Sequence, residues 1–237
     1  MRPVPPAENL NRVGSQPFEM HVKRGHTILS ILVEKLEKYG KAIDGGARIY
    51  DFGCGVGRVT IPLAENYDAE IYGSDVDHTA IEFLEENFSQ KFKALTTGYE
   101  PPLPFEDGFL DIMYSISVWS HFPDHLQSAW LEEMRRIMKK DALLLISTAG
   151  VAHLENWHKK GKRTDITADM LREKGGLFIR NDRLDKNKNL FPGITGDWGV
   201  FYQTTDHIRS AWSKYFTIEE IDEACIGKQD LVVLRKN

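Results

Sequence analysis

The chain has 237 residues, with 30 Lys and Arg against 35 Asp and Glu, and a formal net charge of −5. This acidic balance argues against a protein whose whole surface holds nucleic acid, because such proteins are usually basic. With 41% hydrophobic and 27% charged residues, the composition is that of an ordinary globular chain. We expect residues 1–237 to form a single domain that buries its own core.

The two cysteines, Cys54 and Cys225, are too few for a disulfide framework or a CxxC-type zinc site. Residues 1–6 are not followed by the apolar segment of a secretory signal. No run approaches the ~20 continuous apolar residues of a membrane span. The sequence therefore predicts a soluble cytoplasmic protein without a membrane partner and without a metal site.

The first half of the chain predicts alternating strands and helices. Residues 1–17 lack periodicity and predict an irregular N-terminal arm, whereas residues 25–39 have apolar side chains at helical spacing. Four short apolar runs predict strands at residues 48–52, 70–74, 110–115 and 142–148. Helical patterns between them cover residues 59–66, 79–88 with Asp77 as N-cap, and 126–138. This alternation predicts βαβ units in a doubly wound α/β fold, with a mostly parallel sheet and helices on both faces.

The alternation stops after residue 148. Residues 150–205 are too many for a plain connector and predict an insertion of about 55 residues that covers the site. A helical pattern returns over residues 206–214, and two further strands are predicted at residues 216–221 and 231–234. The domain is thus expected to carry one insertion near its C-terminal end.

A glycine-rich segment, Asp51-Phe52-Gly53-Cys54-Gly55-Val56-Gly57-Arg58, follows the first predicted strand and opens a helix. Glycines there let the backbone approach a ligand, and the free N–H groups of the helix start favour a negative group. Arg58 stands where a dinucleotide-binding loop has its third glycine, which disfavours an NAD-type oxidoreductase. Asp51 would repel a pyrophosphate but suits a ligand that carries an ammonium group.

A second carboxylate, Asp75, ends the second predicted strand 18 residues after Gly57. A carboxylate at this place can accept hydrogen bonds from both hydroxyls of a ribose. Val76 beside it is expected to pack on an adenine. The two acidic residues and the glycine loop together indicate a cofactor of the adenosine type.

These segments resemble the motifs of the class I S-adenosylmethionine-dependent methyltransferases. DFGCGVGR resembles the first motif, GSDVD the second, PPLPFEDGFLDIMYSISVWSHF the third and fourth, and QDLVVLRK the final strand. The resemblance implies a Rossmann-like sheet of seven strands and S-adenosyl-L-methionine as cofactor. The residues that it assigns to the cofactor are Asp51, Gly53, Cys54, Gly55, Gly57, Arg58, Asp75, Val76, Ser115 and Ile116. One departure concerns residues 96–99, which lack the acidic residue that many relatives place near the adenine.

Residues after the fourth predicted strand are the candidates for chemistry, because ligands bind at the carboxyl ends of parallel strands. His121 is the candidate catalytic base, needed only for an acceptor that is protonated at neutral pH; its alternative role is to cap the next helix. Pro123 separates His121 from His125 and argues against a helical two-histidine metal site. The candidate substrate-binding residues are Trp119, Phe122, Trp198 and Tyr202. The aromatic stretch at residues 191–202 is either a substrate lid or a cluster packed under a loop.

The favoured function is O-methylation of a hydroxyl or carboxyl group on a small metabolite, a sugar or a peptide natural product. The alternatives are an NAD-type oxidoreductase, a nucleic-acid methylase and a non-catalytic cofactor-binding module. SISVWSHF replaces the N/D-P-P-Y/F/W motif of nucleic-acid amino methylases, which disfavours a nucleic-acid partner. Residues 156–188 carry 10 Lys and Arg against 5 Asp and Glu, a local charge of +5. This segment is either a solvated loop or a basic cover that attracts an anionic acceptor.

Overall fold

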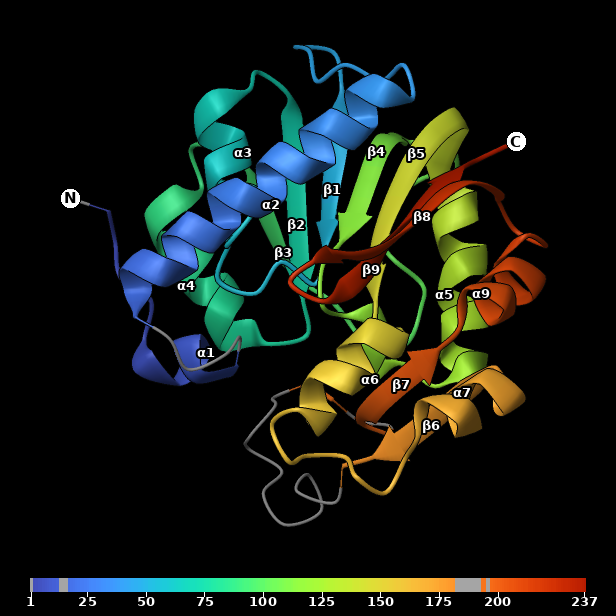
Figure 1. Cartoon of the computed structure of the whole chain (residues 1–237). Helices are drawn as coiled ribbons and strands as arrows, with labels where there is room; N and C mark the ends of the chain where they lie inside the picture. The colour runs from blue at the N-terminus through green and yellow to red at the C-terminus, as the bar shows by residue number, and fades with distance from the viewer. Residues whose placement is uncertain (1, 13–16, 182–192, 195–196) are drawn as a thin grey trace.

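The computed structural model describes residues 2–12, 17–181, 193–194 and 197–237. One central sheet carries helices on both faces, and a smaller unit lies at one edge of it (Figure 1). The helices are α1 (Ala7–Arg12), α2 (Phe18–Lys38), α3 (Thr60–Asn66), α4 (His78–Phe88), the 3₁₀ turn η1 (Trp119–His121), α5 (Asp124–Ile137), α6 (Val151–His158), α7 (Ala168–Lys174) and α9 (Thr205–Trp212). The strands are β1 (Arg48–Phe52), β2 (Glu70–Asp75), β3 (Lys93–Thr96), β4 (Leu110–Ser115), β5 (Met138–Thr148), β6 (Gly176–Arg180), β7 (Gly199–Gln203), β8 (Thr217–Ile226) and β9 (Gln229–Arg235).

Seven strands of the described residues form the central sheet in the order β3-β2-β1-β4-β5-β9-β8. The pairs from β3 to β5 are parallel, whereas β9 runs antiparallel to both β5 and β8. The strand order reverses between β1 and β4, so the loops that follow these two strands flank a crevice at the carboxyl edge of the sheet. The predicted doubly wound, mostly parallel seven-stranded sheet is confirmed.

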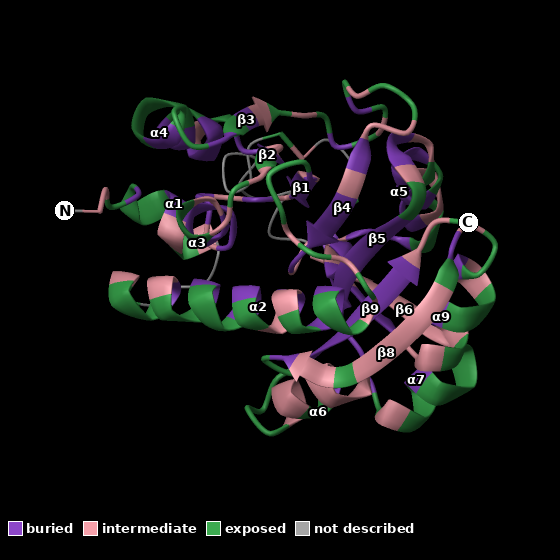
Figure 2. Cartoon of the chain, turned by 90° about the horizontal axis from the view of Figure 1, so that it is seen from above, coloured by how far each residue is buried: buried purple, intermediate pink, exposed green. Residues whose placement is uncertain are grey.

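Each face of the sheet buries its own hydrophobic cluster. Side chains of β5 alternate between the clusters: Leu143 and Leu145 join α2, α3 and α4, whereas Leu144 and Ile146 join α5 and α9. Figure 2 shows α2 and α5 on opposite sides of the buried strands. In the described part of the chain, no helix combines the length and the apolar character that a membrane crossing requires.

The predicted strands at residues 48–52 and 110–115 coincide with β1 and β4, and Asp77 caps α4 by accepting a hydrogen bond from the Thr79 N–H at 3.1 Å. The sequence reading missed β3, which has four residues and pairs only with β2 at the sheet edge. It also expected an irregular arm where α1 forms. The N–H groups of Asn9 and Leu10 both donate to the Pro6 carbonyl, which starts this short helix.

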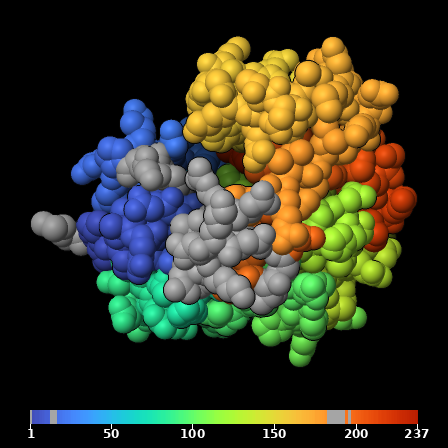
Figure 3. Space-filling view, turned by 90° about the horizontal axis from the view of Figure 1, so that it is seen from below, coloured from blue at the N-terminus to red at the C-terminus, as the bar shows by residue number. Residues whose placement is uncertain are grey.

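The segment predicted as an insertion contains α6, α7 and the hairpin β6-β7. It has its own hydrophobic cluster, made of Ala149, Leu154, Ile166, Leu171 and Tyr202. In Figure 1 it lies below the arrowheads of β1 and β4, and Figure 3 shows it on the same face of the molecule as the N-terminal segment. The insertion therefore stands at the edge of the sheet where the crevice opens.

Candidate cofactor and acceptor site

A cavity of about 340 Å³ lies at the carboxyl ends of the parallel strands. Its wall runs without interruption from the loop after β1, past the ends of β2 and β3, to the segment after β4. It brings together ten of the residues named from the sequence: Gly53, Cys54, Gly55, Arg58, Asp75, Val76, Ile116, His121, Phe122 and Trp198. This cavity is the candidate functional site.

The glycine loop forms one end of the cavity. Gly53, Gly55 and Gly57 have positive φ angles of 78°, 53° and 77°, a region that favours glycine. A Cβ on Gly53 would stand 2.2 Å from the Val118 side chain, so the loop also needs glycine for space. Gly57 lies outside the lining, because its own close neighbours are Ile61 and α4. Its positive φ and its lack of a side chain allow α3 and α4 to pack closely behind the loop.

Asp75 stands beside this loop with both carboxylate oxygens held. The Gly55 N–H donates to Oδ2 at 2.8 Å, and the Asp77 N–H donates to Oδ1 at 2.9 Å. Burial raises the pKa of Asp75, and these two hydrogen bonds oppose that rise. Because each carboxylate oxygen has a further lone pair, Asp75 can still accept hydrogen bonds from a ligand in the cavity.

The wall next to Asp75 is formed by Val76 and by Thr97, Gly98 and Tyr99, which follow β3. The last three belong to the stretch that lacks the acidic residue of many relatives. Tyr99 is buried, and its carbonyl accepts a hydrogen bond from the Trp130 indole at 3.2 Å. This part of the cavity thus offers a mainly apolar slot with backbone polar groups, a surface that suits a flat heterocycle.

The carboxylate of Asp51 lies behind the glycine loop, whereas the sequence predicts that it meets an ammonium group of the ligand. Asp51 is 3% exposed, accepts a hydrogen bond from the Thr60 hydroxyl at 2.6 Å and does not line the cavity. Burial raises its pKa to about 7. Its predicted contact with an ammonium group is therefore not made from the cavity wall, because the side chain points behind the loop toward α3.

Arg58 does line the cavity. In the part of the chain that the structure describes, its guanidinium takes part in no hydrogen bond or ion pair. Burial lowers its pKa, and the nearby Asp51 opposes this effect. Arg58 thus places a cation that has no anionic partner at contact distance just before α3.

His121 stands at the other end of the cavity and is held by the insertion. Its Nδ1 lies 2.7 Å from the Gly199 carbonyl oxygen. A carbonyl can only accept, so Nδ1 carries the proton and Nε2 keeps a free lone pair in the neutral ring. The ring stacks on Trp198, with centroids 4.0 Å apart and planes at 15°. Burial lowers the pKa of His121, although the Gly199 carbonyl opposes this, so the ring is neutral at pH 7.

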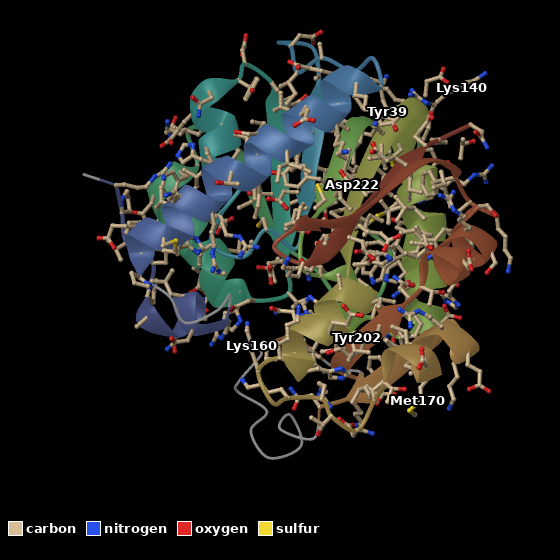
Figure 4. The ribbon with its side chains drawn as sticks, viewed as in Figure 1. Tyr39, Lys140, Lys160, Met170, Tyr202 and Asp222 are labelled. Carbon is tan, nitrogen blue, oxygen red and sulfur yellow. The ribbon has the colours of Figure 1, made fainter. Side chains whose placement is uncertain are left out.

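Besides Asp51 and Gly57, three further residues named from the sequence lie outside the cavity. Ser115 is buried, and its hydroxyl donates to the Phe52 carbonyl at 2.9 Å. Trp119, predicted to bind the substrate, is fully buried in the cluster under α5 and α9, because the η1 turn directs it inward and leaves His121 at the cavity. Tyr202 belongs to the insertion's own cluster, and Figure 4 places it between α6 and β7. None of the three lines the cavity.

The structure adds wall residues that sequence reasoning missed. Asn9 and Arg12 reach the cavity from α1 and both bind Asp77, the first by a hydrogen bond of 3.2 Å and the second by an ion pair. The Pro5-Pro6 pair is the sequence feature that could have predicted this helix, because proline is favoured at helix starts. Ile194 lines the cavity from the insertion. Phe191, Pro192 and Gly196 of the predicted aromatic lid lie outside the described residues.

The described residues contain no group of three or more His, Cys, Asp or Glu side chains placed to hold a metal ion. His125, the second histidine of the pair considered above, lies on the first turn of α5 and is exposed. The described cavity has an apolar slot beside Asp75 at one end and the imidazole of His121 at the other.

Comparison with known proteins points to one family. A family model described as "Methyltransferase domain" matches residues 49–141, from β1 to the beginning of β5. The chain is 28% identical over 106 residues to O-methyltransferase rstn1 of Aspergillus nomiae. It is 30% identical over 105 residues to a probable tocopherol O-methyltransferase of Oryza sativa. These matches cover 43% and 42% of the chain but only 46% and 28% of the relatives' own length.

Solved structures share the fold over almost the whole chain. A protein of Pyrococcus horikoshii OT3 superposes with a TM-score of 0.65 at 19% identity, covering 95% of this chain and 93% of the other. Magnesium protoporphyrin IX methyltransferase of Synechocystis superposes with a TM-score of 0.61 at 18% identity, covering 97% and 94%. The matched segment holds the glycine loop, Asp75 and His121, the residues that form both ends of the cavity. Residues 49–141 therefore carry a methyltransferase domain, and the chain as a whole has the fold of an S-adenosylmethionine-dependent methyltransferase.

Proposed function

We propose that the protein transfers a methyl group from S-adenosyl-L-methionine to an oxygen atom of a small-molecule acceptor. One observation carries the proposal: a single cavity joins the glycine loop and Asp75 at one end to a neutral His121 at the other. Three of the curated relatives are named O-methyltransferases, which supports oxygen as the accepting atom.

The cavity residues fit this cofactor. Asp75 is the proposed acceptor of hydrogen bonds from the ribose hydroxyls, and Val76 and Gly98 are proposed to flank the adenine. The unpaired guanidinium of Arg58 suits the carboxylate of the methionine part. When bound, the cofactor supplies a methyl group on a sulfonium sulfur, which keeps the bonding electron pair as the methyl carbon passes to the acceptor.

The chain's own contribution at the acceptor end is proton removal and alignment. For a hydroxyl acceptor, Nε2 of His121 takes the hydroxyl proton while the oxygen forms its bond to the methyl carbon. Phe122, Ile194 and Trp198 exclude water from this end of the cavity. A carboxylate acceptor carries no proton at neutral pH, so alignment alone would serve it.

We further propose that residues 150–205 form a lid that favours an anionic acceptor. Lys159, Lys160, Lys162 and Arg163 follow one another at the end of α6, and the three lysines are exposed. Figure 4 shows Lys160 at this end of the helix. Burial lowers the pKa of His153, and His121 and Lys160 lower it further, so the basic turn stands on the same side of the molecule as the candidate base. Its positive charge would draw acidic acceptors toward the cavity.

The direct test is cofactor binding followed by a transfer screen. We expect S-adenosylmethionine and S-adenosylhomocysteine to bind in calorimetry, and we expect a labelled methyl group to appear on hydroxyl or carboxyl acceptors, with anionic acceptors preferred at low salt. Binding of NAD without S-adenosylmethionine would instead establish the oxidoreductase alternative. Cofactor binding without transfer to any acceptor of a broad panel would favour the non-catalytic binding module.

A further inference from the structure

We propose that residues 197–199 of the insertion are positioning residues that fix the tautomer of His121. By this proposal, His121 presents an unprotonated Nε2 only while the insertion is seated on the cavity wall. The inference rests on the proposed function for its catalytic meaning, but the tautomer itself can be observed without any reaction. It assigns the insertion a role in the chemical step beyond covering the site.

Three consecutive residues of the insertion each make a separate contact with the cavity wall. The Asp197 carbonyl accepts a hydrogen bond from the Tyr99 hydroxyl. The Trp198 ring stacks on the His121 ring at 4.0 Å, and the Gly199 carbonyl oxygen lies 2.7 Å from His121 Nδ1. Tyr99 follows β3 and His121 follows β4, so this short segment bridges two walls of the same cavity.

The other strand of the β6-β7 hairpin fixes the position of residues 197–199. Gly199 pairs with Arg180 in the β6-β7 ladder, and the Asn181 N–H donates to the Trp198 carbonyl at 2.7 Å. A Cβ on Gly199 would stand 2.2 Å from the Ile179 carbonyl oxygen, so only glycine allows the strands to approach this closely. The carbonyl that faces His121 therefore belongs to a hairpin whose position is set by its partner strand.

Removal of this segment from the wall would change which nitrogen of His121 is basic. Without the Gly199 acceptor, nothing in the described contacts of the ring holds the proton on Nδ1, and the proton is shared between the two nitrogens. An Nε2 that carries the proton cannot accept one from a hydroxyl acceptor. Burial, and to a smaller extent His121 and Lys160, lower the pKa of His153 on α6 to about 4, so this second histidine stays neutral at pH 7.

The experiment is nitrogen-15 NMR of the histidine rings in the full-length protein without cofactor, at pH 7.5. The His121 signals are assigned by their loss in His121→Asn. We expect wild type to carry the proton on Nδ1. Trp198→Ala and Gly199→Ala should shift a substantial fraction of the proton to Nε2, whereas Trp198→Phe should keep the wild-type pattern because a ring remains to stack. Met170→Ala, an exposed change on α7, is the matched insertion control.

Kinetics supply the second readout. With a hydroxyl acceptor, Trp198→Ala and Gly199→Ala should lower kcat about tenfold or more with a smaller change in KM, and Trp198→Phe should recover most of kcat. An Nε2-protonated His121 in wild type, or a tautomer unchanged in both Trp198→Ala and Gly199→Ala, would overturn the inference. Failure of methyl transfer with an intact tautomer response would overturn the proposed function and leave the positioning role established.

Discussion

The backbone N–H of Gly55 donates to Oδ2 of Asp75 at 2.8 Å and so joins the loop after β1 to the end of β2. Both partners line the cavity, and the hydrogen bond keeps one carboxylate oxygen at a fixed place in its wall. Asp75 thus orders the glycine loop and remains able to accept from a ribose.

Asp75→Ala should weaken S-adenosylmethionine binding at least tenfold, because it removes the ribose acceptor and the partner of the Gly55 N–H together. Asp75→Asn keeps one acceptor oxygen and should therefore weaken binding less than Asp75→Ala does. Calorimetric Kd values decide this, with Asp169→Asn, an exposed change on α7, as control. Equal Kd values for wild type and Asp75→Ala would refute the ribose assignment.

Arg58→Ala should weaken binding of the methionine part of the cofactor and leave binding of its adenosine part unchanged. If the guanidinium binds the methionine carboxylate, the variant should bind S-adenosylmethionine about tenfold or more weakly, since charge-assisted hydrogen bonds are worth about 1.5–3 kcal/mol. It should bind 5′-methylthioadenosine, which has no carboxylate, with the affinity of wild type. Competition titrations with both ligands measure this, and an equal loss for both would show that Arg58 shapes the loop instead.

His121→Asn should lower kcat toward a hydroxyl acceptor about a hundredfold while leaving the Kd of the cofactor unchanged. Asparagine can keep an N–H near the Gly199 carbonyl but has no counterpart of Nε2. In wild type, kcat should fall as the pH drops through the pKa of His121, which burial places below its usual 6.5. A pH profile of kcat for both proteins checks this, and a carboxylate acceptor should show neither effect.

Asp51→Asn should change how stability depends on pH. The folded-state pKa of Asp51 is raised from 3.8 to about 7, so between these values the folded protein binds more protons than the unfolded chain. The free energy of unfolding of the wild type therefore decreases as the pH rises from 4 to 7. The variant lacks this carboxyl group and does not show the decrease. The variant should gain roughly 2–4 kcal/mol relative to wild type across this window.

Urea unfolding of both proteins at several pH values measures this gain. His21 and His153, whose pKa values are lowered to about 4, give the opposite slope, but they are present in both proteins and cancel in the difference. A stability difference that stays constant from pH 4 to pH 7 would contradict the raised pKa of Asp51.

Much of the fold could be predicted from the spacing of apolar residues, because the central strands and helices have clear hydrophobic patterns. β1, β4 and the apolar part of β5 are buried almost throughout, and a strand covered on both faces shows as a continuous apolar run. β3 was missed because only Ala94 is buried among its four residues. The elements of the insertion were missed because their apolar residues belong to a small separate cluster, which leaves only short patterns in the sequence.

The cofactor end of the site was also largely predictable, since Gly53, Gly55 and Asp75 lie in sequence directly after strands whose carboxyl ends must converge. The acceptor end was predicted less well. His121 was identified, but neighbouring Trp119 was assigned to the cavity although the η1 turn buries it. The partners of His121 come from residues 198–199, and no local pattern reveals a pairing across nearly 80 positions.

The separate hydrophobic cluster of the insertion has an evolutionary consequence. Leu154, Ile166 and Leu171 bury one another without drawing on either cluster of the central sheet. Substitutions in α6, α7 or the β6-β7 hairpin can therefore reshape the mouth of the cavity while the sheet and the glycine loop keep their stability. Selection can retune acceptor preference in this chain as an independent trait, so its close homologues should diverge fastest between residues 150 and 205.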